Sequence, residues 1–114
     1  MKARVAVAST DGKAVNQHFG RADSFLIFDV GDGGFAYVER RRVPPFCAGG
    51  DHEGRSGGEV SALLGALADC RAVVAARIGA GAAGLLDEHG IDSIESRGAI
   101  EDVLARIIES KALG

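Results

Sequence analysis

Residues that can bind metals are concentrated in two polar loops of this chain. The first loop contains Asn16 and His18, and the second contains Cys47 and His52. Thiolates suit zinc, copper(I) and iron–sulphur clusters, whereas imidazole suits iron and zinc. One thiolate and two imidazoles complete neither a structural zinc site nor a four-cysteine iron–sulphur site. We therefore interpret this set as one that holds a metal–sulphur cluster loosely and passes it on.

A third loop is rich in glycine and follows an apolar run. Its backbone N–H groups near Gly79 and Gly81 are suited to holding negative charge where a helix begins. The segment lacks the Lys-Ser or Lys-Thr pair of a phosphate-binding P-loop. A tight turn between a strand and a helix explains the two glycines as well.

Each candidate ligand also has an explanation that involves no ligand. His18 can hydrogen-bond the backbone of its own loop, Cys47 can be an ordinary loop thiol, and His52 can be a solvated side chain. Cys70 lies between a helical pattern and an apolar strand, which predicts a small buried side chain. His89 lies near a predicted helix end, where a cation interacts favourably with the helix dipole.

Two other functions fit the same sequence. Asp11, Asp29 and Asp51 are candidates to hold a divalent metal in a small enzyme or a nucleotide-binding domain. The other function is that of a protein-interaction module that binds no metal.

The apolar pattern predicts an α/β domain with the element order β-β-β-α-β-α-β-α. The first strands are short and β-branched or aromatic, and turn residues at 31–34 imply an antiparallel hairpin. The later alternation of strand and helix implies parallel pairing, in which ligands lie at the carboxyl ends of strands. Segment 15–20 has neither period and is expected to be a loop. The predicted strands are 4–9, 24–30, 35–43, 72–76 and 91–95, and the predicted helices are 60–67, 82–88 and 99–111.

Length and composition fit one globular domain over residues 1–114. The formal net charge of −3 and the lack of a large basic patch argue against a nucleic-acid partner. No apolar run is long enough to cross a bilayer, and the first residues lead straight into a strand pattern without a signal-peptide region. Two cysteines make no disulfide framework. We expect a cytoplasmic protein with reduced thiols and no membrane contact.

Two segments resemble one known family. The apolar run 5–9 followed by 16–20, Asn-Gln-His-Phe-Gly, is similar to the opening of the nitrogenase iron–molybdenum cofactor biosynthesis family. That family includes NifX, NafY and the C-terminal domain of NifB. Residues 75–79, with Gly84-Leu85-Leu86 downstream, resemble its second signature. The resemblance covers nearly the whole chain.

The resemblance implies a three-layer α/β/α, RNase H-like domain with a five-stranded mixed sheet. It also implies transient binding of an iron–sulphur cluster or an iron–molybdenum cofactor precursor. By motif match His18 is the first candidate for contact with the cluster, Cys47 resembles the cysteine of the loop in NifB-type members, and His52 is included because it lies near Cys47.

The implied role is that of a carrier in nitrogenase cofactor biosynthesis, not an enzyme. The chain has no counterpart of the three-cysteine motif in the radical-enzyme part of NifB. Its expected partners are proteins that donate and accept clusters, and we expect a monomer or a weak homodimer.

Overall fold

A five-stranded mixed sheet forms the centre of the computed structural model, which describes residues 3–31, 33–43 and 57–110. The strand order is β4-β3-β1-β5-β6, so β1 is central. It pairs antiparallel with β3 and parallel with β5. This confirms the predicted mixed sheet. The strands are β1 (Ala3–Val7), β3 (Ser24–Gly31), β4 (Gly34–Arg42), β5 (Ala72–Ala75) and β6 (Asp92–Glu95).

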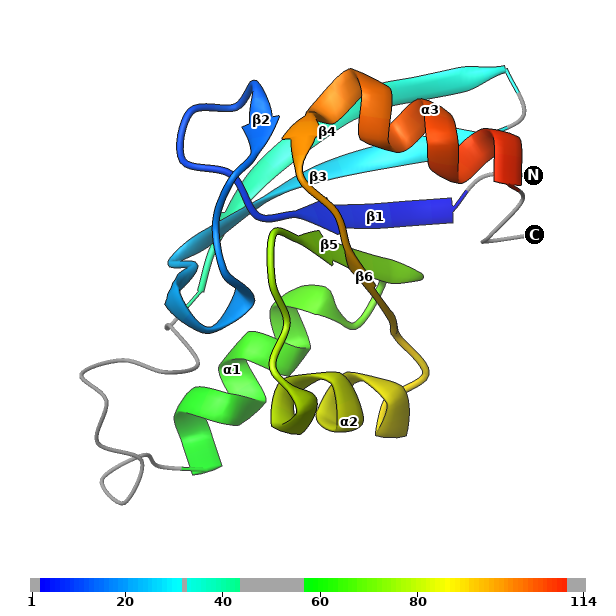
Figure 1. Ribbon diagram of the computed structural model, residues 1–114. Coiled ribbons are helices and arrows are strands. Elements are labelled where there is room, and N and C mark those ends of the chain that lie inside the picture. Colours follow the sequence, from blue (N-terminus) through cyan, green and yellow to red (C-terminus); the bar gives the residue numbers. More distant parts are fainter. Residues whose placement is uncertain (1–2, 32, 44–56, 111–114) are drawn as a thin grey trace.

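Helices cover both faces of this sheet. In Figure 1, α1 (Gly57–Leu67) and α2 (Ala80–Glu88) lie on one face and α3 (Ile100–Ser110) lies on the other. Successive side chains of a strand point to opposite faces. Accordingly Ala6 and Val73 belong to the core beneath α1 and α2, whereas Val5 and Val74 belong to the core beneath α3.

The predicted hairpin is formed by β3 and β4, which pair antiparallel from Ser24–Arg42 to Gly31–Gly34. Gly34 has a φ of 134°, which other residues rarely adopt. The register shifts between Ile27 and Phe28, which leaves a bulge in the ladder. β4 is an edge strand and its side chains are mostly exposed.

Helix α2 ends as the sequence predicts. Gly90 has a φ of 73° and follows the cap residue His89. The N–H groups of Gly90 and Ile91 bond to the carbonyl oxygens of Asp87 and Leu86 at 3.0 and 2.9 Å. These are the two hydrogen bonds of a Schellman motif, which satisfies carbonyls that the helix leaves free.

The structure corrects two parts of the predicted pattern. Segment 15–20 is not wholly irregular, because it includes the end of strand β2 (Ala14–Val15) and a 3₁₀ turn, η1 (Phe19–Arg21). β2 pairs with β7 (Gly98–Ala99) in a second small sheet, and two-residue strands are too short to produce a visible period. Helix α2 begins at Ala80, so Gly81 lies in the helix and not in the preceding turn.

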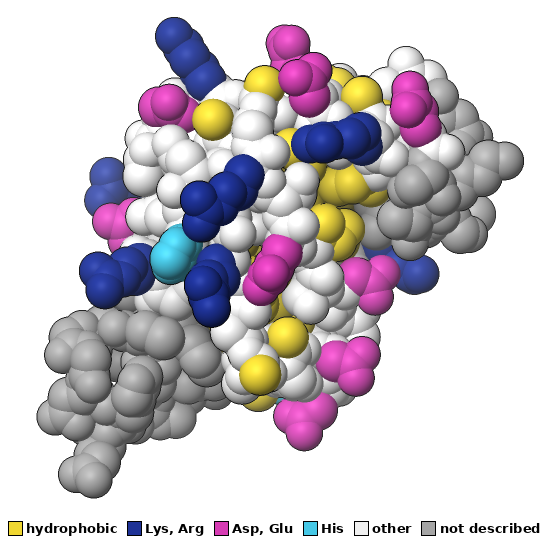
Figure 2. Space-filling view, in the orientation of Figure 1, with side chains coloured by type: hydrophobic (Ala, Val, Ile, Leu, Met, Phe, Trp, Pro, Cys, Tyr) yellow, Lys and Arg dark blue, Asp and Glu magenta, His cyan; other side chains and the backbone are white. Residues whose placement is uncertain are grey.

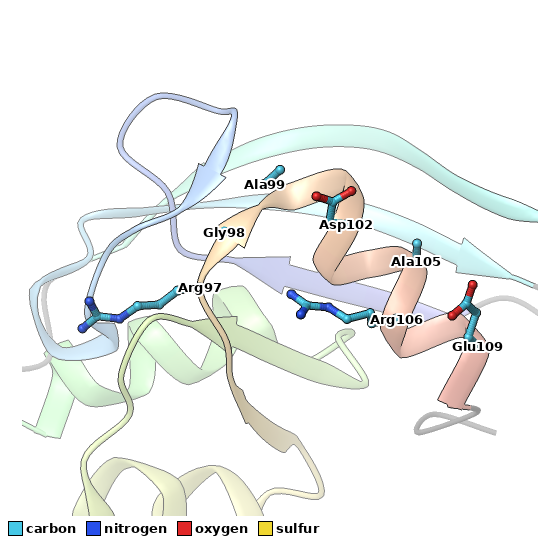
Figure 3. A pocket seen from close by; sticks show the side chains of 7 residues that line it. All are labelled: Arg97, Gly98, Ala99, Asp102, Ala105, Arg106 and Glu109. Carbon is cyan, nitrogen blue, oxygen red and sulfur yellow. The ribbon is translucent and has the colours of Figure 1, made fainter.

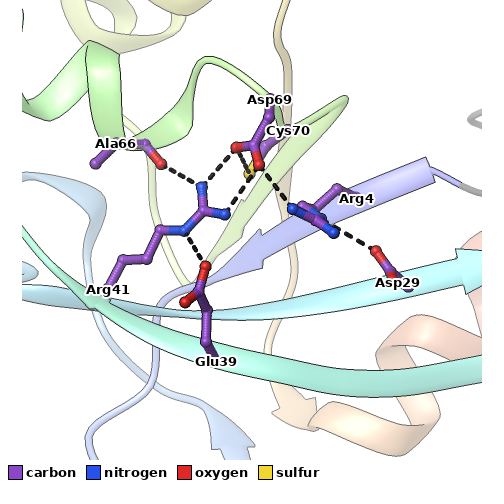
Figure 4. A network of polar contacts seen from close by, with 7 residues as sticks. All are labelled: Arg4, Asp29, Glu39, Arg41, Ala66, Asp69 and Cys70. Carbon is purple, nitrogen blue, oxygen red and sulfur yellow. Dashed lines mark hydrogen bonds and ion pairs between the residues drawn. The ribbon is translucent and has the colours of Figure 1, made fainter.

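A network of charged side chains ties three strands to the α1–β5 turn (Figure 4). Asp69, in that turn, accepts hydrogen bonds from Arg4 at 2.8 Å and from Arg41 at 2.9 Å. Arg4 also donates to Asp29 at 3.1 Å, and Arg41 donates to the carbonyl of Ala66 at 2.7 Å. Strands β1, β3 and β4 are thereby joined to the carboxyl end of α1.

Candidate functional site

His18 is held by backbone hydrogen bonds at the carboxyl end of β5. The N–H of Ala76 donates to the carbonyl of Gln17 at 3.0 Å, and the N–H of Phe19 donates to the carbonyl of Arg77 at 2.9 Å. These bonds make a parallel bridge between His18 and Arg77. The segment after β2 therefore continues the sheet where β5 ends. This is the edge at which ligands bind in parallel α/β sheets.

The neighbours of His18 are buried or bonded, but its imidazole is exposed. Phe19 is 2% exposed and its ring lies 5.7 Å from that of Phe25. Among the described residues, the His18 side chain forms no hydrogen bond and does not cap η1. The explanation in which His18 bonds its own loop is therefore not realised in this part of the chain. Its ring nitrogens are available to a ligand.

Asn16 uses its side chain to close the loop before His18. Its Oδ1 accepts from the N–H of Thr10 at 3.0 Å, and its Nδ2 donates to the Thr10 hydroxyl at 3.0 Å. Asp11 organises the same loop by accepting from the N–H groups of Lys13 and Ala14, and these bonds lower the pKa of its carboxyl group. A direct contact between Asn16 and a cofactor stays a prediction.

Arginines surround His18, and the sequence reasoning missed them. Arg77 is its bridge partner, and residues directly opposite in a β-bridge point to the same face. Arg21 lies three residues beyond His18, and its N–H bonds to the His18 carbonyl at 3.2 Å. Figure 2 shows a histidine among several basic side chains over the segment between β2 and η1. The sequence contains one signal of this surface. A basic residue follows each of two neighbouring parallel strands, Arg77 after the first and Arg97 after the second.

The glycine segment begins α2 next to this surface. Gly79 is the N-terminal cap residue of α2 and has no side chain that could cap the helix. Gly81 lies in the first turn of that helix. A Cβ atom at either glycine would meet no atom within 4 Å, and both residues are exposed. The Ile78 N–H just before them donates to Glu95 Oε2 at 2.8 Å. Within the described chain, therefore, no steric contact requires glycine at 79 or 81.

The remaining candidate residues fall into two groups. Cys47, His52 and Asp51 lie outside the described residues, so their roles stay predictions. Cys70 is 5% exposed, and burial raises the pKa of its thiol to about 12, as expected of a small core residue. The His89 Nδ1 lies 2.9 Å from the carbonyl oxygen of Leu85, near the end of α2 as predicted.

The described residues separate two of the three acids of the divalent-metal alternative, Asp11 and Asp29. They contain no group of three His, Cys, Asp or Glu side chains placed to hold a metal ion. Asp29 is paired with Arg4 near the amino end of β1, whereas Asp11 organises the loop beyond the carboxyl end of that strand. No helix in the described ranges is long and apolar enough to span a bilayer.

An open groove of about 560 Å³ runs between β7 and α3. Arg97 and Arg106 line it together with Asp102 and Glu109. Figure 3 shows the Arg97 side chain extending away from α3, toward the side of the molecule that carries the segment after β2. Arg97 thus contributes to the groove and also extends toward the surface around His18.

Comparisons with known proteins agree with this fold and with the family resemblance seen in the sequence. The model of the dinitrogenase iron-molybdenum cofactor family matches residues 1–110. The chain is 35% identical over 103 residues to the FeMo cofactor biosynthesis protein NifB of Frankia alni, covering 90% of this chain and 20% of that protein. It is 33% identical over 117 residues to NifB of Azotobacter vinelandii, covering 96% of this chain and 23% of that protein. The chain thus spans about a fifth of these relatives.

A solved structure shares the architecture over nearly the same length. The crystal structure of PH0822 superimposes with a TM-score of 0.67 at 25% sequence identity. The match covers 94% of this chain and 91% of that one. The five-stranded sheet with helices on both faces is therefore found in a second protein of about the same extent.

Proposed function

Because the chain belongs to the dinitrogenase iron-molybdenum cofactor family, we propose that it binds an iron–sulphur cluster or an iron–molybdenum cofactor precursor and carries it between proteins. The observation that carries the proposal is the exposed imidazole of His18, which forms no hydrogen bond among the described residues and is carried on a fixed backbone. In this proposal the domain has no catalytic role. Its partners are the proteins that supply and receive the cluster, and its fold is of the RNase H-like type.

His18 is suited to be an exchangeable ligand. An imidazole nitrogen binds iron, and this one needs no rearrangement of the loop to become available. The backbone bonds of Gln17 and Phe19 fix the segment on either side, so little conformational entropy is lost when a ligand binds. An imidazole ligand of this kind suits a site that must release its cluster as well as bind it.

Cys47 is the second ligand in the proposal and His52 assists it. A thiolate from one loop and an imidazole from another would ligate a cluster from two sides. The uncapped first turn of α2 near Gly79 would add backbone N–H groups facing negative charge. The roles of Cys47, His52 and Gly79 rest on family resemblance and ligand chemistry.

The test is an anaerobic titration of the metal-free protein with a synthetic thiolate-capped [4Fe–4S] cluster, repeated with isolated iron–molybdenum cofactor. Visible absorbance and protein-bound iron after gel filtration report binding. The titrated proteins are the wild type and three variants: His18→Ala, Cys47→Ala and, as a matched histidine control, His89→Gln. His89 is a fair control because its ring is bonded to the end of α2.

We expect iron to co-elute with the wild type and with His89→Gln. We expect at least tenfold less iron with His18→Ala, because a lost metal–nitrogen bond is not replaced by water at equal strength. A wild type that retains neither cluster contradicts the proposal. Equal retention by wild type and His18→Ala, with loss in Cys47→Ala, would assign the contact to Cys47 and remove His18 from the site.

A further inference from the structure

We infer that Arg77 and Arg97 form an anion-binding row beside His18, which makes the site select negatively charged cargo over simple metal cations. This inference rests on the proposed function, because it names the charge class of the cargo that the His18 surface takes. It adds to that function a binding element that the ligand residues alone do not provide. The name arginine row is used below for Arg77 and Arg97.

The pairing of β5 with β6 brings the two arginines to the same end of the sheet. β5 and β6 pair in parallel up to Ala75 and Glu95, and the N–H of Ser96 donates to the Ala75 carbonyl at 2.9 Å. Arg77 and Arg97 each lie two residues beyond the last pair of this ladder, Arg77 in a bridge with His18 and Arg97 directly before β7. Since neighbouring strands lie about 4.8 Å apart, both arginines follow closely spaced strand ends at one edge of the sheet.

His18 extends the same row on its other side. Its bridge with Arg77 sets these two residues side by side, and β7, which begins directly after Arg97, pairs with β2, the strand before His18. All three side chains are exposed. A ligand bound to the His18 ring therefore lies within reach of at least one guanidinium group, and within the Debye length of about 8 Å at physiological salt.

The charge of the row is not neutralised within the described chain. Neither Arg77 nor Arg97 forms an ion pair there, and the carboxylate of nearby Glu95 is already an acceptor for the Ile78 N–H. Arg71, at the other end of β5, does have a partner, with its Nε 3.7 Å from Asp92 Oδ2. Like charges held side by side repel each other, so an anion is the species that lowers the energy of this surface.

The chemistry of the guanidinium group narrows the class of ligand. Arginine presents a planar fork of donors that matches anionic oxygen and sulphur acceptors, and it stays charged at every working pH. Clusters built from sulphide and thiolate carry net negative charge, whereas a free metal ion is positive. The same row that attracts the cluster therefore repels the bare metal, although His18 would accept either.

The experiment measures three probes with five proteins at low and at physiological salt. The probes are the thiolate-capped [4Fe–4S] cluster, inorganic pyrophosphate and Fe²⁺ alone. The proteins are the wild type, Arg77→Gln, Arg97→Gln, the double variant and Arg71→Gln. Arg71 is the matched control, because it flanks the same strand about 20 Å away at roughly 3.3 Å per residue.

We expect each single change to weaken binding of the cluster and of pyrophosphate about fivefold, and the double change about twentyfold, with the loss shrinking at high salt. Arg71→Gln stays within about twofold of the wild type. Binding of Fe²⁺ is unchanged or tightens in the double variant, because a repulsion has been removed. Circular dichroism of each variant shows that the fold is intact.

The probes separate this inference from the proposed function. If the cluster binds equally well to the wild type and the double variant, the arginine row is overturned while the carrier proposal stands. If no cluster binds but pyrophosphate does, and the double variant loses it, the carrier proposal fails and the anion site remains. If Fe²⁺ loses affinity together with the cluster in the double variant, the row does not select by charge.

Discussion

Arg4 and Arg41 lie among carboxylates near the amino end of β5, whereas Arg77 and Arg97 lie beyond its carboxyl end with no ion pair in the described chain. The first pair joins β1 and β4 to the α1–β5 turn through Asp69, and Arg4 also bonds Asp29 of β3 (Figure 4). Arg77 of the second pair lies beside an exposed histidine whose ring forms no hydrogen bond in the described part of the chain. Arginine side chains therefore lie in two different environments at the two ends of β5, which are about twenty ångströms apart.

This difference separates residues that hold the fold from residues that are free to bind. A charged group that is already paired within the protein stabilises the native state, and it has few interactions left to offer a ligand. An unsatisfied one contributes little to folding, and its interaction energy becomes available on binding. Substitutions at the two ends of β5 should therefore affect stability and ligand binding in opposite proportions.

Asp69→Ala is expected to give the largest loss of stability. It leaves the Arg41 side chain, which is 20% exposed, without its bidentate partner. Asp69 itself is 45% exposed, so solvent screens part of the interaction. We expect a decrease of about 1.5 kcal/mol in the free energy of unfolding, measured by urea denaturation. The control Asp92→Ala removes only a 3.7 Å contact between exposed groups, and its effect should stay below about 0.5 kcal/mol. Equal effects of the two changes would contradict the assignment.

The pH dependence of stability gives a second, smaller test at the same end of β5. Hydrogen bonds from Arg41, and then from Arg4, hold the pKa of Asp69 well below its ordinary value. A carboxyl group with a lowered folded-state pKa stabilises the protein above its unfolded pKa of about 3.9, and this stability is lost as pH falls below that value. We expect the urea midpoint of the wild type to fall more steeply from pH 5 to pH 2 than that of Asp69→Asn. Parallel pH profiles would show that Asp69 is not the group that titrates.

Glu95 provides a test at the other end of β5. Its carboxylate accepts the N–H of Ile78, a residue that is 7% exposed. Glu95→Ala should cost about 1 kcal/mol, because a buried backbone donor loses a charged acceptor. Glu95→Gln keeps an acceptor and should cost less than half of that. It also removes a negative charge next to the arginine row, so pyrophosphate should bind about twofold more tightly. Weaker binding of pyrophosphate to Glu95→Gln would contradict the charge argument.

The sequence was enough to predict the elements with strong patterns. The five main strands, the hairpin and the three helices were all visible in runs of apolar residues, and Gly90 marked the end of α2. The strands β2 and β7 could not be predicted from the sequence. Each has only two residues, which is too short to show an alternating pattern, and the two strands pair only when distant segments meet.

The candidate site was predictable only where it depends on a local motif. His18 could be chosen because its neighbours in sequence form a recognisable segment. Arg77 and Arg97 each follow an apolar strand in the sequence, but the two strands are 20 residues apart, and only the sheet shows that they are neighbours. The bonds of Asn16 to Thr10 depend in the same way on how the loop closes. Residue type predicts which chemistry is available, but the pairing of strands decides which groups meet.

The smallest expected effect on stability is the sharpest test of the comparison. The double variant of Arg77 and Arg97 to glutamine removes two charges, yet neither forms an ion pair in the described chain. Its free energy of unfolding should therefore stay within about 0.5 kcal/mol of the wild type. A small gain is expected at low salt, since repulsion between adjacent like charges is relieved. Urea denaturation at two salt concentrations measures both. A loss comparable to that of Asp69→Ala would mean that these arginines hold the fold, and the distinction between the two ends of β5 would no longer stand.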